Sequence, residues 1–422
     1  MSDLAPFALP QWIESNKDKI KLPLAGSATP GLSIQDLINL STDKPTTTSN
    51  LSFQSLKLTL GPFEGSHPLR KSIAALYNDS ITADHIFPTH GTTGANALLF
   101  QSLLKAGDHV VVMYPCYTQL ISLPKSIPGV EVDYWKLDLE NGAKADIQAL
   151  KELIRPSTKM IVLNNPNNPL GTVLSRDKQN EIVDVAREHG LIILVDEIFR
   201  PLFHNTDTDT NIHANTQTDI PLSFIDLPPP HDYSNIIVTS SMSKAWGLSG
   251  TRVGWLATRN TSILSTGLNR GLYTIMALGS IDEAIAAEAL SERCRPQILD
   301  KHLGFARANV ALIEEFVGRN AGVCGWVKPV GGGTGFLRFF GKGAGGERVP
   351  VDDVSFCTRL REDKGVLLAP GSLCFGMSDA GGDGNAGGRD FRGYVRVHIT
   401  VDPGVMERAL VAIGEFLAEY TE

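Results

Sequence analysis

The stretch Ser241-Met242-Ser243-Lys244-Ala245-Trp246-Gly247-Leu248-Ser249-Gly250-Thr251-Arg252-Val253-Gly254-Trp255 places one amine among hydroxyl groups, glycines and an arginine. The apolar residues before it predict that Lys244 lies just past the end of a buried strand, where open α/β sheets usually place small-molecule chemistry. A lysine there can form a Schiff base with an aldehyde. Ser241, Ser243 and Arg252 offer hydrogen-bond donors suited to a phosphate group. Taken alone, a lysine among serines and glycines is also common in solvated loops.

Apolar runs at 110–113, 160–163, 191–195 and 236–238 alternate with helical patterns between about residues 84 and 260. Buried β-branched runs separated by helices predict a mostly parallel sheet covered on both faces, which is a large three-layer α/β domain. From about residue 300 a shorter alternation predicts a smaller α/β unit. We therefore expect an N-terminal arm (residues 1–50) that belongs to the small domain, a large domain (51–295) and a small C-terminal domain (296–422).

The composition favours a protein that acts on small molecules. The chain has 422 residues, of which 42% are hydrophobic, and a net charge of -8, so it lacks the basic footprint of a protein that binds nucleic acid or an anionic membrane. Its five cysteines are odd in number and form no C-x-x-C pair, so neither a disulfide framework nor a metal site is indicated. No signal-like or membrane-spanning segment is evident, and we expect a cytoplasmic location.

A second polar group follows another predicted strand, at Gly91, Thr92 and Thr93, where a helix begins. Free backbone amides at the start of a helix, together with threonine hydroxyls, bind anions well. The same residues are also an ordinary helix cap.

Three further positions follow predicted strands. Tyr117 could stack on a flat ring, or could simply be a core or rim aromatic residue. Asn168 lies in an Asn-Pro-rich turn, a sequence that also occurs in turns without chemistry. Asp196 ends the most apolar strand, where a carboxylate is costly unless a positive group such as a protonated pyridine nitrogen faces it. Its neighbour Glu197 is the alternative, a solvated or salt-bridged carboxylate.

Arg396 alternates with apolar residues in a predicted strand, and its guanidinium could grip a carboxylate at two points, although strand arginines are more often surface residues. In the N-terminal arm, the segment at residues 22–27 contains Gly26, whose backbone could approach a ligand. An arm with packing duties alone is an equal alternative. The Thr/Asp-rich residues 204–222 and the glycine-rich residues 341–346 and 376–388 are expected to be connecting loops.

The spacing S-x-S-K-x-x-G-x-x-G-x-R-x-G around Lys244 resembles the lysine segment of class I/II aminotransferases, fold-type I enzymes that use pyridoxal 5'-phosphate. The resemblance extends in order through an N-P-x-G turn at Asn168, Asp196 and Arg396. It implies that Lys244 and Asp196 are catalytic and that Arg396 and Gly26 contact the substrate. It also implies a cofactor site made of Gly91, Thr92, Thr93, Tyr117, Asn168, Asp196, Ser241, Ser243, Lys244 and Arg252.

By this resemblance the chain is expected to be an aminotransferase, a homodimer whose substrates are an amino acid and a 2-keto acid. Two positions depart from the family pattern, since many relatives have tyrosines where this chain has Leu60 and Phe199. These departures keep open a pyridoxal-phosphate-dependent lyase or cyclase similar to capreomycidine synthase or aminocyclopropane-carboxylate synthase. A sensor or binding module without catalysis is the third alternative.

Overall fold

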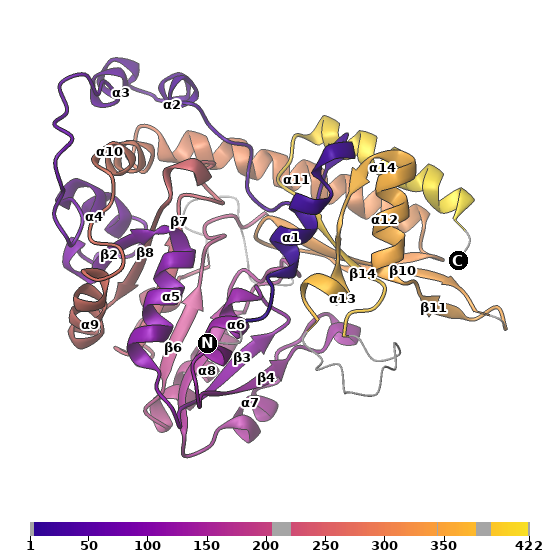
Figure 1. The fold of residues 1–422 in the computed structure, drawn as a ribbon, viewed down its shortest axis with the longest axis horizontal. Coiled ribbons are helices and arrows are strands. Elements are labelled where there is room, and N and C mark those ends of the chain that lie inside the picture. Colours follow the sequence, from indigo (N-terminus) through magenta and orange to yellow (C-terminus); the bar gives the residue numbers. More distant parts are fainter. Residues whose placement is uncertain (1–3, 205–220, 344, 377–389, 421–422) are drawn as a thin grey trace.

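The computed structural model describes residues 4–204, 221–343, 345–376 and 390–420. Two sheets with their helices lie side by side, and the long helix α11 (Arg295–Arg319) runs from one to the other (Figure 1). We call the seven-stranded sheet and its helices the large part, and the five-stranded sheet and its helices the small part. The expected loops at 204–222 and 376–388 lie almost wholly outside the described residues.

The large part confirms the predicted mostly parallel sheet. Strand β8 alone pairs antiparallel with both of its neighbours, and the other strand pairs of this sheet are parallel. Across the sheet the order is β2 (Ile86–His90), β8 (Val253–Thr258), β7 (Ile236–Ser241), β6 (Ile192–Asp196), β5 (Thr158–Asn164), β3 (His109–Tyr114) and β4 (Glu131–Lys136).

Helices cover both faces of this sheet because alternate residues of its central strands are apolar in both directions. In β5, for example, Ile161 and Leu163 belong to one core while Met160 and Val162 belong to another. The first core is completed by α4 (His67–Ala74), α7 (Ile147–Leu153), α8 (Arg176–Glu188) and α10 (Ser280–Ala289), and the second by α5 (Gly91–Leu103), α6 (Gln119–Lys125) and α9 (Thr261–Gly271). The three layers match the expectation.

The small part has its own core between a mainly antiparallel sheet and three helices. Its sheet has the order β11 (Arg348–Pro350), β10 (Thr334–Lys342), β14 (Tyr394–His398) and β13 (Ala369–Pro370), with β9 (Cys324–Val327) paired to β10. Helices α12 (Asp353–Lys364), α14 (Pro403–Glu419) and the second half of α11 pack on it, and α13 (Gly371–Cys374) follows β13. The division at residues 50 and 295 stays a proposal, supported by these separate cores.

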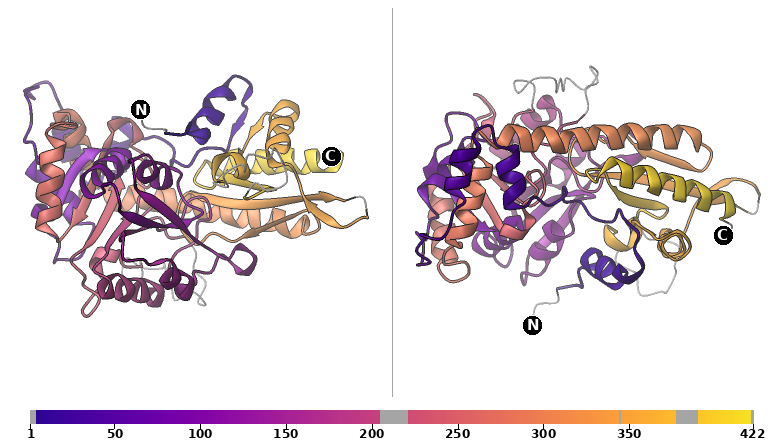
Figure 2. Two further views of the ribbon diagram at one scale, coloured as in Figure 1. Left: turned by 60° about the horizontal axis from the view of Figure 1, so that its bottom comes forward. Right: turned by 90° about the horizontal axis from the view of Figure 1, so that it is seen from above.

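The N-terminal arm contacts both parts (Figure 2). Its helix α1 (Ala8–Ser15) lies against α13, and β1 (Leu22–Pro23) pairs in parallel with β12 (Val366–Leu367) of the small part. Its helices α2 (Ile34–Leu40) and α3 (Lys44–Asn50) lie against α11 and α10 instead. Among the described residues, no helix combines the length and the apolar character needed to cross a membrane.

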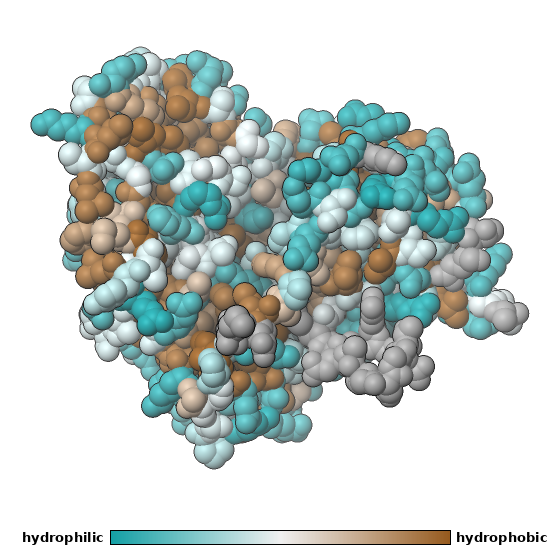
Figure 3. All heavy atoms as spheres, viewed as in Figure 1, coloured by the Kyte–Doolittle hydropathy of each residue, from teal (hydrophilic) through white to brown (hydrophobic). Residues whose placement is uncertain are grey.

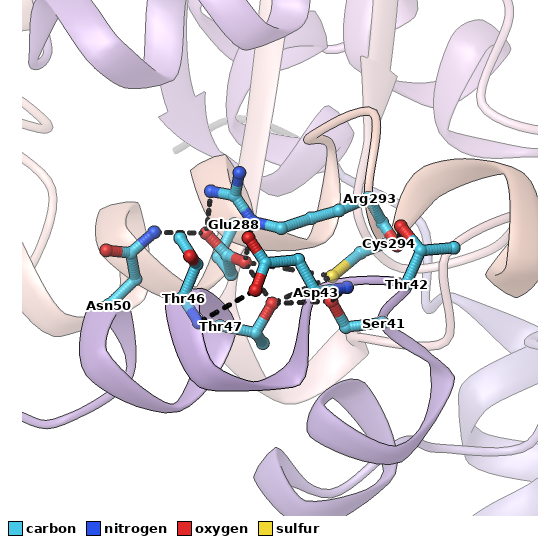
Figure 4. A network of polar contacts seen from close by, with 9 residues as sticks. All are labelled: Ser41, Thr42, Asp43, Thr46, Thr47, Asn50, Glu288, Arg293 and Cys294. Atoms are coloured by element: carbon cyan, nitrogen blue, oxygen red, sulfur yellow. Dashed lines mark hydrogen bonds and ion pairs between the residues drawn. The ribbon is translucent and has the colours of Figure 1, made fainter.

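A polar network holds α3 to the large part (Figure 4). The buried carboxylate of Glu288 accepts hydrogen bonds from Thr47 and Asn50 of α3 and forms an ion pair with Arg293, at 2.6, 2.8 and 2.7 Å. These charge-assisted contacts bring the pKa of Glu288 down to about 2 against the opposing effect of burial. The arm is therefore anchored at residues 47–50 as well as at β1.

Gly254 of the opening motif is required by close packing between β8 and the start of α5. A Cβ atom built at this position would lie 2.2 Å from the carbonyl carbon of Gly91 and 2.6 Å from the amide nitrogen of Thr92. Backbone atoms cannot move away as the end of a flexible side chain can. The glycine thus lets the strand touch the helix start that is expected to bind an anion.

We predict that Gly254→Ala lowers the free energy of unfolding by about 1–3 kcal/mol, the usual cost of overpacking. Gly250→Ala is the matched control, because its Cβ would meet no atom of the described residues within 4 Å. Urea denaturation of both variants measures the difference. Equal stability of the two variants would contradict the assignment of Gly254 to this contact.

Candidate active site

A cavity of about 520 Å³ lies where the large part, the small part and the N-terminal arm meet. The polar ends of β5, β6 and β7, the start of α5, the arm and strand β14 all contribute side chains to it. Eleven of the twelve site residues predicted from the sequence line it, and Gly91 lies immediately behind. The eleven are Gly26, Thr92, Thr93, Tyr117, Asn168, Asp196, Ser241, Ser243, Lys244, Arg252 and Arg396.

Lys244 follows the end of β7 and presents its amine to this cavity. Burial lowers its pKa to about 8, assisted by the charges of Arg396 and Arg252 and opposed by Asp196. The Nζ atom donates a hydrogen bond to Ser27 Oγ at 2.8 Å. The lowered pKa raises the uncharged fraction of this amine near neutral pH, and the uncharged amine can act as a nucleophile or a base.

Asp196 ends β6 with its side chain buried in the same cavity. Burial raises its pKa to about 6, although hydrogen bonds from the Ile198 amide and from Asn96 favour the charged form. Asn96 is oriented in turn by the hydroxyl of Thr239, which donates to its side-chain carbonyl at 2.9 Å. The carboxylate is held in a fixed direction and has capacity for one more cationic or donor partner.

The donors expected to hold a phosphate group converge on one end of the cavity. Thr92 stands at the start of the 13-residue helix α5, and its buried hydroxyl has no hydrogen-bond partner among the described residues. Arg252 adopts a left-handed backbone conformation (φ 54°), unusual for a residue other than glycine. A Cβ atom on Gly91 would lie 2.8 Å from its guanidinium. Helix start and guanidinium together form an electropositive cup.

Arg396 is buried between the small part and the arm rather than on the surface. It donates hydrogen bonds to the side chain of Asn168 at 3.0 Å and to the backbone carbonyl of Ala25, while its Nε has no partner in the part of the chain that the structure describes. Burial lowers its pKa to about 10, so it remains charged at neutral pH. Among the described lining residues of this cavity Asp196 is the one carboxylate, and Arg396 is suited to an anionic group of a ligand.

The other residues discussed in the sequence analysis lie in different environments. The ring of Tyr117 lines the cavity and also contacts the ring of Phe7 of the arm, which is tilted by 52° with its centroid 5.4 Å away. Phe199 is buried, with its ring centroid 6.0 Å from Lys244 Nζ. Leu60 is 64% exposed. Glu197 is buried rather than solvated, but it is salt-bridged as expected, with Arg200 Nε at 3.8 Å, and it accepts hydrogen bonds from Ser223 and from the Phe224 amide.

Several cavity residues make contacts that the sequence does not predict, among them Ser27 of the arm segment at residues 22–27. Ser27 holds the lysine amine, and His398 lies on the same face of β14 as Arg396, a period-two signal that could have revealed it. Burial lowers the pKa of His398 to about 3, so its ring is neutral. Leu9 and Ile13 of α1 add an apolar wall, for which no sequence motif exists.

Comparison with known proteins agrees with this geometry. The model of the family "Aminotransferase class I and II" matches residues 21–413. Capreomycidine synthase of Streptomyces vinaceus is 26% identical over 98% of this chain and 96% of its own length, and a tyrosine aminotransferase of Caenorhabditis elegans is 26% identical over 84% and 70%. The crystal structure of a PLP-dependent aminotransferase from Streptococcus suis has 30% sequence identity and a TM-score of 0.83, covering 100% of this chain and 99% of that one. The chain belongs to the class I and II aminotransferase family.

Proposed function

We propose that the protein is a pyridoxal-phosphate-dependent aminotransferase acting on an amino acid through Lys244. The observation that carries the proposal is that one cavity combines a reactive amine, a buried carboxylate and an electropositive cup. The family membership and the similarity to a PLP-dependent aminotransferase support it. The roles of the individual residues below are part of the proposal.

The residues present fit the cofactor. The cup offers a helix start, the unpartnered hydroxyl of Thr92 and the guanidinium of Arg252, which suit a phosphate dianion. Asp196 has room for one more partner and suits a protonated ring nitrogen. Tyr117 offers one ring face, and Asn168 an amide for the phenolic oxygen.

When bound, the cofactor supplies an aldehyde that condenses with amines and a ring that withdraws electrons from the substrate's Cα. Lys244 would hold it through its Nζ, and the same Nζ, when free, would carry a proton to and from the substrate's Cα. Asp196 would keep the ring nitrogen protonated. The apolar residues Leu9 and Ile13 of the arm exclude water from this side of the cavity.

The lining also restricts the substrate's side chain. If Arg396 binds the α-carboxylate and Arg252 the phosphate, no further charged group remains among the described lining residues besides Lys244 and Asp196. His398 is neutral because burial lowers its pKa to about 3. A second carboxylate or an ammonium group on the substrate would therefore stay unpaired. We infer a substrate whose side chain is uncharged.

A lyase or cyclase is the second candidate. In the position where many family members have a tyrosine, this chain has the buried ring of Phe199, which adds no donor beside Lys244. Capreomycidine synthase, moreover, matches the chain over nearly its whole length. With the cofactor bound, the withdrawal of electrons from Cα would also serve elimination or ring closure, which need no keto acid.

Exposed apolar residues support a homodimer. Of the ten large hydrophobic residues that are exposed in the described part, seven fall in two short segments: Leu56, Leu58, Leu60, Phe63, Leu272, Tyr273 and Met276. The segments are adjacent, since Gly61 lies beside the carbonyl of Leu278. Hydrophobic atoms are visible along the edge where the chain between α3 and α4 runs (Figures 1 and 3). A patch of this kind marks a protein interface.

The predicted cytoplasmic location remains a proposal. All five cysteines are buried and unpaired, which suits a reducing compartment. Cell fractionation would test it, and recovery outside the cytosol would contradict it.

We predict that amino acids with uncharged side chains yield more than one equivalent of keto acid per active site only when a keto-acid acceptor such as pyruvate is supplied. Chromatography of the products, with and without acceptor, measures this. An unsaturated or cyclic product formed without acceptor would contradict transamination and would show that the protein is a lyase or cyclase.

In the same assay, aspartate, glutamate and arginine should have a kcat/KM at least about tenfold lower than uncharged amino acids of similar size, because a buried unpaired charge is costly. Pyruvate should likewise be a better acceptor than 2-oxoglutarate. A preference for dicarboxylates would show that a cation outside the described lining enters the site.

We predict that the protein has twice the chain mass in light scattering, and that the double variant Leu58→Asp/Tyr273→Asp is monomeric because charges then lie in the apolar patch. Val411→Asp is the control, since Val411 is similarly exposed on α14, outside the patch. A monomeric wild type, or a double variant that stays dimeric, would contradict the interface.

A further inference from the structure

The amine of Lys244 is held from the N-terminal arm and not from the sheet that carries it. Its Nζ donates to the hydroxyl of Ser27 at 2.8 Å, across 217 residues of sequence. The ring of Phe199, which has no polar atom, has its centroid 6.0 Å from the same Nζ. Within the described residues, Ser27 is the hydrogen-bond acceptor that this amine has.

The backbone around Ser27 is fixed on both sides. Before it, the Leu24 carbonyl accepts from the His398 amide at 2.9 Å, and the Ala25 carbonyl accepts from Arg396. After it, the hydroxyl of Thr29 donates to the backbone carbonyl of Lys244 at 2.6 Å. Further along, the Leu32 amide donates to the Gly247 carbonyl, also at 2.9 Å. The arm thus forms hydrogen bonds with the backbone of residues 244–247 and with the amine of Lys244.

Contacts at both ends of the arm also fix the position of Ser27. Strand β1 pairs with β12 just before Ser27, and Glu288 fixes α3 beyond it (Figure 4). Ser27 itself is 9% exposed, and its carbonyl packs against Gly333 of the small part. A hydroxyl held by so many backbone contacts is pre-organised, so it can orient a flexible lysine side chain at little entropic cost.

We propose that Ser27 is a positioning residue for Lys244, whose hydroxyl holds the amine on the arm side of the cavity whenever that amine is free. The inference rests on the proposed role of Lys244 as the reacting amine. In each turnover the free amine must take a proton from Cα and return one. Ser27 fixes the position of Nζ for that transfer. The nearby ring of Phe199 has no polar group that could do so.

The charged groups that face Lys244 are known, so the contribution of Ser27 can be separated from theirs. Arg396 and Arg252 lower the pKa of Lys244 and Asp196 raises it, while His398 is neutral. A hydroxyl that accepts a hydrogen bond from the ammonium form stabilises that form and raises the pKa. Removing the hydroxyl leaves the other charges in place and should lower the pKa further.

The first experiment uses the cofactor-free protein. Lys244 is labelled with acetic anhydride across pH 6–10, and its modification is measured by mass spectrometry of the peptide. We expect a midpoint near pH 8 in the wild type and about one pH unit lower in Ser27→Ala. Ser33→Ala, which removes the N-terminal cap of α2 without touching the amine, should keep the wild-type midpoint. An unchanged or raised midpoint in Ser27→Ala overturns the proposal.

A pair of control variants tests whether a shifted midpoint comes from a general loosening of the arm. Ser27→Thr and Ser27→Val add the same volume, but only threonine keeps a hydroxyl. The threonine variant should restore the wild-type midpoint, and the valine variant should behave as Ser27→Ala. Equal midpoints in the two variants would show that packing, and not the hydroxyl, governs the amine.

The enzyme with pyridoxal phosphate bound allows a second, independent measurement. With a substrate accepted by the wild type, Ser27→Ala should slow exchange of the Cα hydrogen by about tenfold and change KM by less than about twofold, since Arg396 is intact. A raised KM with unchanged exchange would make Ser27 a substrate contact and overturn the proposal. If the wild type bound no pyridoxal phosphate, the proposed function would fail, while the labelling experiment would still decide the role of Ser27.

Discussion

The burial of an amine and a carboxyl group in one cavity is the constraint on which this structure depends. Removing Lys244 and Asp196 from water destabilises their charged forms, which lowers the pKa of the amine to about 8 and raises that of the carboxyl to about 6. A fold tolerates such groups only where they have partners or a function. Here parallel strands end at the cavity, an arm closes it, and a third buried charge, Arg396, enters from the small part.

Much of this arrangement could be predicted from the sequence. The buried β-branched runs at β3, β5, β6 and β7 required a covered parallel sheet, and polar residues after such runs had to meet at one edge of it. The spacing from Ser241 to Gly254 was specific enough to indicate the cofactor as well. Local patterns of this kind survive in the sequence because strand ends and tight turns restrict residue type.

Other features depend on contacts between distant segments and leave no local pattern. Nothing near Ser27 shows that it will meet an amine 217 residues away, and the apolar wall of Leu9 and Ile13 reads as an ordinary amphipathic helix. The hydrogen bond between Arg396 and Asn168 likewise joins the two parts of the molecule. These contacts follow from how the arm and the small part pack on the large part, so they needed coordinates.

The most direct test of the central claim is to add pyridoxal phosphate to the purified protein, reduce it with borohydride and map the modified peptide by mass spectrometry. Our account predicts one stable pyridoxyl group, on Lys244, and its loss in Lys244→Ala. Modification of another lysine, or of none, would contradict the assignment of this cavity as the active site.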